Sequence, residues 1–132
     1  MSAKTCYLGL MSGTSLDGVD AALVDLASQP RLLYSLHLPL PAEVRAEALA
    51  LHMAGEDELR RASELACRLA EIYAKAVLDL LAESRTAPQS IAAIGCHGQT
   101  IRHCPGQGYS IQLNNPALLA ERTGITVVAD FR

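Results

Sequence analysis

The sequence is poor in aromatic residues, lacks tryptophan and carries no excess of positive charge. Only 4% of its 132 residues are aromatic, and the formal net charge is −3. Proteins that bind nucleic acid present clustered basic side chains or aromatic platforms on which bases stack, so this composition argues against both kinds of interface. No apolar run is long enough to span a bilayer, so we expect no membrane partner either.

Cysteine is sparse, and its spacing excludes the common cysteine motifs. The four cysteines are Cys6, Cys67, Cys96 and Cys104. No two of them form a Cys-x-x-Cys pair, and the first residues lack the apolar segment of a secretory signal. We therefore expect reduced thiols and a cytoplasmic location. A zinc site in which His97 and His103 join the last two cysteines stays open as an alternative, although its spacing matches no common zinc motif.

Half of the residues are hydrophobic, and their periodicity predicts one α/β domain. Strands are predicted at 5–11, 19–26, 31–38, 90–96, 109–113 and 125–129. Helices are predicted at 42–53, 56–83 and, between an Asn115 cap and Gly124, 116–123. Short connections make the first three strands antiparallel, whereas later strands return through helices and are expected to pair in parallel. The order of these elements is βββααβ(β)αβ, where the strand in parentheses is the short one at 109–113. The expected fold is a five-stranded mixed sheet with flanking helices, in the condensed order βββαβαβα.

The connection between the first two predicted strands is rich in glycine and hydroxyl residues. It reads Ser12-Gly13-Thr14-Ser15-Leu16-Asp17-Gly18-Val19-Asp20. Glycine lets the backbone turn and lets a ligand approach it, so N–H groups and hydroxyls can surround an anionic oxygen. Asp17 and Asp20 are candidate ligands for magnesium beside a triphosphate. The segment lacks the lysine of a Walker A loop and the strand-to-helix context of a dinucleotide fingerprint; a plain hairpin turn is the alternative.

A second polar segment, His97-Gly98-Gln99-Thr100, directly follows the strand predicted at 90–96. Ligands of α/β sheets bind beyond the carboxyl ends of strands, so we expect a substrate loop here. Its imidazole, amide and hydroxyl groups suit the hydroxyls, N-acetyl group or carboxylate of a sugar. Asp130 and Arg132, just past the last predicted strand, can meet the same ligand. The alternatives are a polar strand end and a salt-bridged terminus.

The segment from Gly9 to Leu26 is similar to the opening of the anhydro-N-acetylmuramic acid kinases, which belong to the actin/hexokinase/Hsp70 superfamily. The similarity extends to 94–103, to 112–114 with the helix after it, and to 127–132. It implies a ribonuclease-H-like or actin-like ATPase domain whose hairpin binds ATP phosphates, here through 13–20. It also implies that His97, Gly98, Gln99, Thr100, Asp130 and Arg132 bind the substrate. Met11 stands where many superfamily kinases carry an acid, so the resemblance transfers no magnesium ligand to that position.

The resemblance also implies a reaction. Such kinases use ATP and Mg²⁺ to open 1,6-anhydro-N-acetylmuramic acid with water and to phosphorylate O6, which yields N-acetylmuramic acid 6-phosphate during cell-wall recycling. The family's general base lies in a second domain. Residues 1–132 are therefore expected to be the N-terminal phosphate- and sugar-binding domain of a two-domain kinase, without a catalytic residue and inactive alone, and a homodimer is conceivable for the full-length protein. A non-catalytic nucleotide- or sugar-binding module and a structural domain remain alternatives.

Overall fold

Three strands open the fold and pair with one another in chain order. In the computed structural model, which describes residues 3–132, they are β1 (Cys6–Ser12), β2 (Gly18–Asp25) and β3 (Arg31–Pro39). β2 pairs antiparallel with both β1 and β3, which confirms the predicted opening of the sheet. Side chains alternate along β1, so Leu8 and Leu10 are buried. Gly9 and Met11 lie on the other, exposed face.

The second half of the sheet is built around one long strand. The elements are β4 (Ile91–Cys104), β5 (Tyr109–Leu113) and β6 (Val127–Val128). β4 pairs in parallel with β1 and β6 and antiparallel with β5, and the strand order is β3-β2-β1-β4-β5 with β6 also on β4. The prediction of a mixed sheet with flanking helices is thus confirmed. Residues 3–132 form six strands, one near each predicted range, so the expectation of a five-stranded sheet is wrong.

The course of β4 corrects the prediction of a substrate loop at 97–100. The strand does not end at Cys96 but continues to Cys104, so this polar segment lies inside it. β4 changes partner here, pairing with β1 up to Gln99 and with β5 from Gln99 onward. Gly98 sits at this junction with a φ of 81°. A Cβ atom there would lie 2.5 Å from the carbonyl oxygen of Leu113, so only glycine fits without a shift of the backbone.

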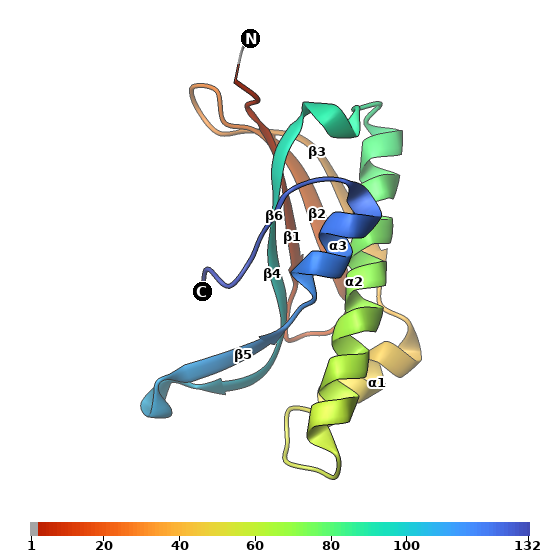
Figure 1. Cartoon of the computed structure of the whole chain (residues 1–132), viewed down its shortest axis with the longest axis vertical. Coiled ribbons are helices and arrows are strands. Elements are labelled where there is room, and N and C mark those ends of the chain that lie inside the picture. Colours follow the sequence, from red (N-terminus) through yellow and green to blue (C-terminus); the bar gives the residue numbers. More distant parts are fainter. Residues whose placement is uncertain (1–2) are drawn as a thin grey trace.

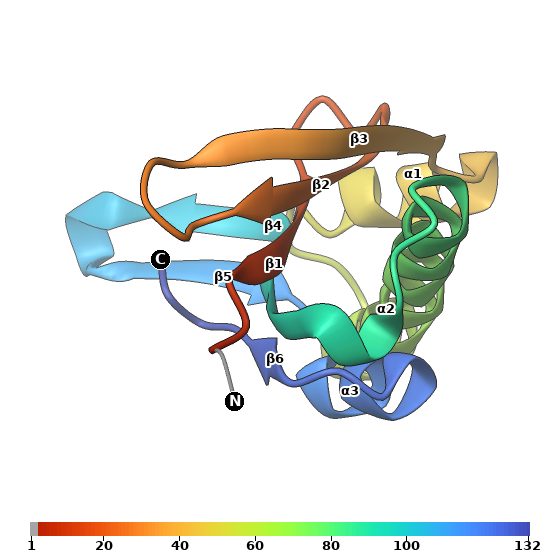
Figure 2. The same ribbon diagram turned by 90° about the horizontal axis from the view of Figure 1, so that it is seen from above.

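Helices cover one face of the sheet (Figure 1, Figure 2). They are α1 (Ala42–Ala50), α2 (Glu58–Glu83) and α3 (Pro116–Thr123), with short 3₁₀ turns at Pro88–Ser90 and Pro105–Gln107. One face of α2 is apolar and buried, and it includes Leu65, Leu69, Tyr73, Val77 and Leu80. The side chain of Asn115 accepts a hydrogen bond from the N–H of Leu118, and Gly124 ends α3, as predicted. The observed order, βββααββαβ, is that of the individually predicted helices and strands; it differs from the condensed order βββαβαβα, which counts one helix before β4 and no strand directly after it.

The opposite face of the sheet carries a row of small residues. Ser35, Ala22, Gly9 and Gly95 are consecutive register partners across β3, β2, β1 and β4. No helix of residues 3–132 lies on this face (Figure 2). Within the same described part of the chain, no helix is both long enough and apolar enough to cross a membrane.

Candidate functional site

The hairpin between β1 and β2 is a tight turn anchored by one apolar side chain. The N–H of Leu16 donates to the carbonyl oxygen of Gly13 at 3.1 Å. Leu16 has a φ of 57°, uncommon for a branched residue, and its side chain is buried in the hydrophobic core. Thr14 and Ser15 consequently lie exposed at the tip, so their hydroxyls are accessible to a ligand.

Two buried polar contacts support the hairpin from below. The hydroxyls of Ser12 and Tyr73 are hydrogen bonded at 2.7 Å, which connects β1 to α2. Burial raises the pKa of Tyr73, so its hydroxyl stays neutral. The amide Nε2 of Gln99 donates to the carbonyl oxygen of Gly13 at 3.2 Å, which connects β4 to the turn.

The two aspartates of the hairpin differ in their surroundings. Asp17 is exposed and accepts a hydrogen bond from the Ser15 hydroxyl at 2.9 Å, which lowers the pKa of that carboxyl group. Asp20 faces His37 on β3, with 2.8 Å between its carboxylate and Nδ1. This hydrogen bond raises the pKa of His37. The imidazole also covers Gly18, where a Cβ atom would lie 2.5 Å from Nε2.

A polar cavity of about 340 Å³ brings together three of the six residues predicted to bind substrate, His97, Asp130 and Arg132. Its polar lining consists of His97, Ser110, Gln112, Asn114, Asp130 and Arg132. Three of these, Ser110 and Gln112 on β5 and Asn114 just after it, were not predicted from the sequence. Their place beside His97 depends on the pairing of β5 with the second half of β4. Arg132 donates to the hydroxyl of Thr100 at 3.1 Å, and Gln112 donates to the same oxygen at 3.1 Å.

A neighbouring cavity of about 430 Å³ joins this region to the hairpin. It is lined by Met11, Ser12, Gly13, Thr14, His97, Thr100 and Arg132. His97 and Arg132 therefore border both cavities. Gln99, in contrast, is fully buried, and Gly98 is buried at the strand junction; neither lines either cavity, so the structure places them beneath the predicted site.

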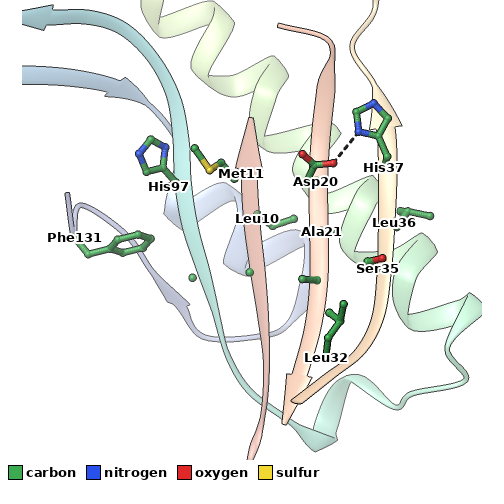
Figure 3. Close-up of a pocket in the computed structure, with 13 residues that line it drawn as sticks. Leu10, Met11, Asp20, Ala21, Leu32, Ser35, Leu36, His37, His97 and Phe131 are labelled. Atoms are coloured by element: carbon green, nitrogen blue, oxygen red, sulfur yellow. Dashed lines mark hydrogen bonds and ion pairs between the residues drawn. The ribbon is translucent and has the colours of Figure 1, made fainter. Parts of the chain in front are cut away.

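A third cavity, of about 690 Å³ and larger than the two above, lies on the open face of the sheet (Figure 3). Its floor is the row of small residues, with Leu32 and Phe131 at its sides. Figure 3 shows Met11, Asp20 and His37 at one end of it, with His97 nearby. The charged and imidazole groups therefore gather at the hairpin end, and the rest of the cavity is lined by apolar residues and Ser35.

The described residues contain only a partial set of metal ligands. Within 3–132, no three His, Cys, Asp or Glu side chains are placed together around a metal position. The zinc alternative thus finds no cluster there, and burial raises the pKa of Cys96 to about 11, which keeps its thiol protonated. Magnesium commonly takes one or two carboxylates together with water and phosphate oxygens. Asp17 and Asp20 each offer one exposed carboxylate, which is the kind of protein ligand that such a site uses.

Comparison with known proteins gives consistent matches along the chain. Residues 5–132 match the family model described as anhydro-N-acetylmuramic acid kinase. The chain is 56% identical to the anhydro-N-acetylmuramic acid kinase of Bordetella petrii, over 96% of this chain and 34% of that protein. It is 56% identical to the protein of the same name from Nitrosospira multiformis and 52% identical to that from Pseudomonas putida, over 96% of this chain and 35% of each relative. The chain spans about a third of the length of the curated relatives it matches.

Proposed function

The chain belongs to the anhydro-N-acetylmuramic acid kinase family, and from this premise we propose that it supplies the phosphate-binding hairpin and part of the sugar site of an ATP-dependent kinase. The proposed reaction opens the 1,6-anhydro bond of 1,6-anhydro-N-acetylmuramic acid with water and transfers a phosphoryl group from ATP to O6. The observation that carries the proposal is that the hairpin cavity and the polar cavity share His97 and Arg132. Phosphoryl transfer requires donor and acceptor side by side and in line, which adjoining cavities allow.

The hairpin, residues 13–20, holds the phosphates in this proposal. Its tip offers the hydroxyls of Thr14 and Ser15, while Leu16 fixes the turn from inside the core. Fixed donors around a phosphate need no rearrangement when charge develops, which favours transfer. Asp17 and Asp20 are the residues that would hold a magnesium ion, which neutralises phosphate charge when bound.

The polar cavity holds the sugar. The guanidinium group of Arg132 suits the lactyl carboxylate of the substrate, because it can pair with a carboxylate through two parallel hydrogen bonds. Asp130 and His97 offer partners for hydroxyl or N-acetyl groups, and the Thr100 hydroxyl keeps Arg132 in place. Gln112 and Asn114, which line the same cavity, join this set.

We assign the remaining parts of the reaction to a second domain. The curated relatives are about three times as long as this chain, which leaves room for another domain of the same kind. In this division the general base that activates water and the adenosine site belong to the second domain. Residues 1–132 then bind and orient the phosphates and the sugar without performing the chemistry.

The experiment compares two proteins: the chain 1–132, and a polypeptide of the relatives' length that contains it, which we call the complete kinase. We expect the complete kinase to convert the anhydro sugar and ATP to the 6-phosphate and ADP, detected by mass spectrometry. The chain 1–132 should form no product. No product from the complete kinase would refute the kinase assignment, whereas turnover by 1–132 would refute the division of labour between domains.

A further inference from the structure

Gln99 is buried in a position that its polarity does not explain. The side chain is fully inaccessible, and its Nε2 donates to two backbone carbonyl oxygens, those of Gly13 and Thr100, each at 3.2 Å. Its Oε1 has no hydrogen-bond partner among residues 3–132. Leaving a buried acceptor unpaired costs folding free energy, so an apolar side chain of similar size would suit the core at least as well. Stability alone therefore does not explain why an amide occupies this position.

The contact with Gly13 controls the orientation of one peptide group. The carbonyl oxygen of Gly13 accepts from both Gln99 and the N–H of Leu16, so it points into the protein. In a planar trans peptide the next N–H points the opposite way. That N–H belongs to Thr14, which lines the cavity shared with His97 and Arg132 and whose N–H has no hydrogen-bond partner among residues 3–132.

We propose that Gln99 is a positioning residue of the phosphate hairpin: by holding the Gly13 carbonyl inward, it turns the Thr14 N–H outward toward a phosphate oxygen of ATP. The inference rests on the proposed function and sharpens it. Gln99, which the resemblance assigned to substrate binding, is thereby assigned to binding of the nucleotide phosphates. Without Nε2 only the Leu16 N–H holds the Gly13 carbonyl, so the peptide between Gly13 and Thr14 is held less firmly and the Thr14 N–H is directed less precisely at the ligand.

The main test is Gln99→Met in the complete kinase, with Gln107→Met as the matched control, because Gln107 is exposed in the turn between β4 and β5. We expect Gln99→Met to raise KM for ATP about tenfold, while KM for the sugar changes less than twofold and the melting temperature does not fall. The control should leave both KM values unchanged. Equal increases in the two KM values, or no change in either, would overturn the proposal.

A second variant tests the donor itself and stands even if Gln99→Met folds poorly. Gln99→Glu places an ionised carboxylate against two carbonyl oxygens, and only its protonated form can donate to them. The ratio of the KM for ATP of Gln99→Glu to that of wild type, measured at each pH, should decrease toward 1 as the pH falls. A ratio that does not change with pH contradicts the proposed role.

A third measurement separates this inference from the kinase assignment. In ¹⁵N-labelled chain 1–132, inorganic tripolyphosphate should shift the amide signal of Thr14 in wild type but not in Gln99→Met. If wild-type complete kinase forms no product, the proposed function fails, and this shift still decides whether Gln99 presents the Thr14 amide. A shift that persists in the variant, or is missing in wild type, overturns the inference.

Discussion

The hairpin and the polar cavity lie side by side but are built in opposite ways. The hairpin is one continuous segment, 13–20, fixed from below by buried contacts from Tyr73 and Gln99. The polar cavity is assembled from β4, from the end of β5 and from 129–132, and its charged residues Asp130 and Arg132 are exposed. The first region is therefore rigid before a ligand arrives, whereas the second depends on pairing between distant strands and on side chains that face solvent.

The largest effect should come from the strand junction that creates the polar cavity. Gly98→Ala combines a left-handed backbone with a Cβ atom 2.5 Å from the carbonyl oxygen of Leu113. We expect the free energy of unfolding to fall by about 3 kcal/mol in urea denaturation. Gly108→Ala is the control, because Gly108 has a φ of 79° but no atom within 4 Å of such a Cβ, and it should lose about 1 kcal/mol. Equal losses of unfolding free energy in Gly98→Ala and Gly108→Ala would contradict the close approach of Gly98 to the Leu113 carbonyl oxygen.

The next effect concerns the support beneath the hairpin. Tyr73→Phe removes one of two buried hydroxyls and leaves that of Ser12 without its partner. The free energy of unfolding should fall by about 1–2 kcal/mol. Tyr109→Phe is the matched control, since Tyr109 is exposed on β5, and it should change stability little.

A double variant decides whether the two hydroxyls act as a pair. Ser12→Ala with Tyr73→Phe leaves neither group unpaired, so its loss should be smaller than the sum of the two single losses. Strict additivity would show that the hairpin is not held through this hydrogen bond.

A smaller effect separates the two aspartates of the hairpin. Asp20 accepts a hydrogen bond from His37, which holds the pKa of His37 above its usual 6.5, while Asp17 adds only a weaker charge effect. We expect Asp20→Asn to lower the pKa of His37 clearly and Asp17→Asn to lower it slightly, measured from the imidazole ¹³Cε1 signal. Similar shifts in the two variants would contradict the direct pairing of Asp20 with His37.

The raised pKa of His37 also has a consequence for stability. Folding favours the protonated imidazole, so this contribution is complete below the unfolded-state pKa and is lost as the pH rises through the folded-state pKa. Denaturation of wild type and Asp20→Asn should therefore differ more at pH 5 than at pH 9. An equal difference at both pH values would show that the imidazole charge adds nothing.

The contrast between the two regions also explains what the sequence could predict. The hairpin and the ends of α3 follow from local patterns of glycine, hydroxyl and capping residues, and their bounds were predicted closely. The pairing of Asp20 with His37 could not be predicted in this way, because a bulge between Leu23 and Val24 shifts the register of β2 and β3 by one residue. Without the bulge, the register beside the β2–β3 turn, where Asp25 pairs with Arg31, would have paired Asp20 with Leu36.

The course of β4 was hidden for a related reason. A polar segment after an apolar strand is typical of a loop, and periodicity does not reveal that a strand exchanges one partner for another at Gly98. The same exchange buries Gln99 beneath the hairpin, although its polarity suggested a ligand contact. Roles that depend on which strand lies alongside therefore required the structure.

The smallest effect on stability should come from Arg132, and it sharpens the comparison most directly. Arg132 is exposed and donates to the Thr100 hydroxyl, so Arg132→Gln should change the free energy of unfolding by less than about 0.5 kcal/mol. In the complete kinase it should nevertheless raise KM for the anhydro sugar about tenfold, because the carboxylate loses its charged partner. Arg132→Lys keeps the charge but lacks the planar guanidinium group, so its KM for the anhydro sugar should lie between those of wild type and Arg132→Gln. If KM for ATP rose equally, Arg132 would serve the phosphates as well, and the boundary between the two cavities would not separate nucleotide from sugar.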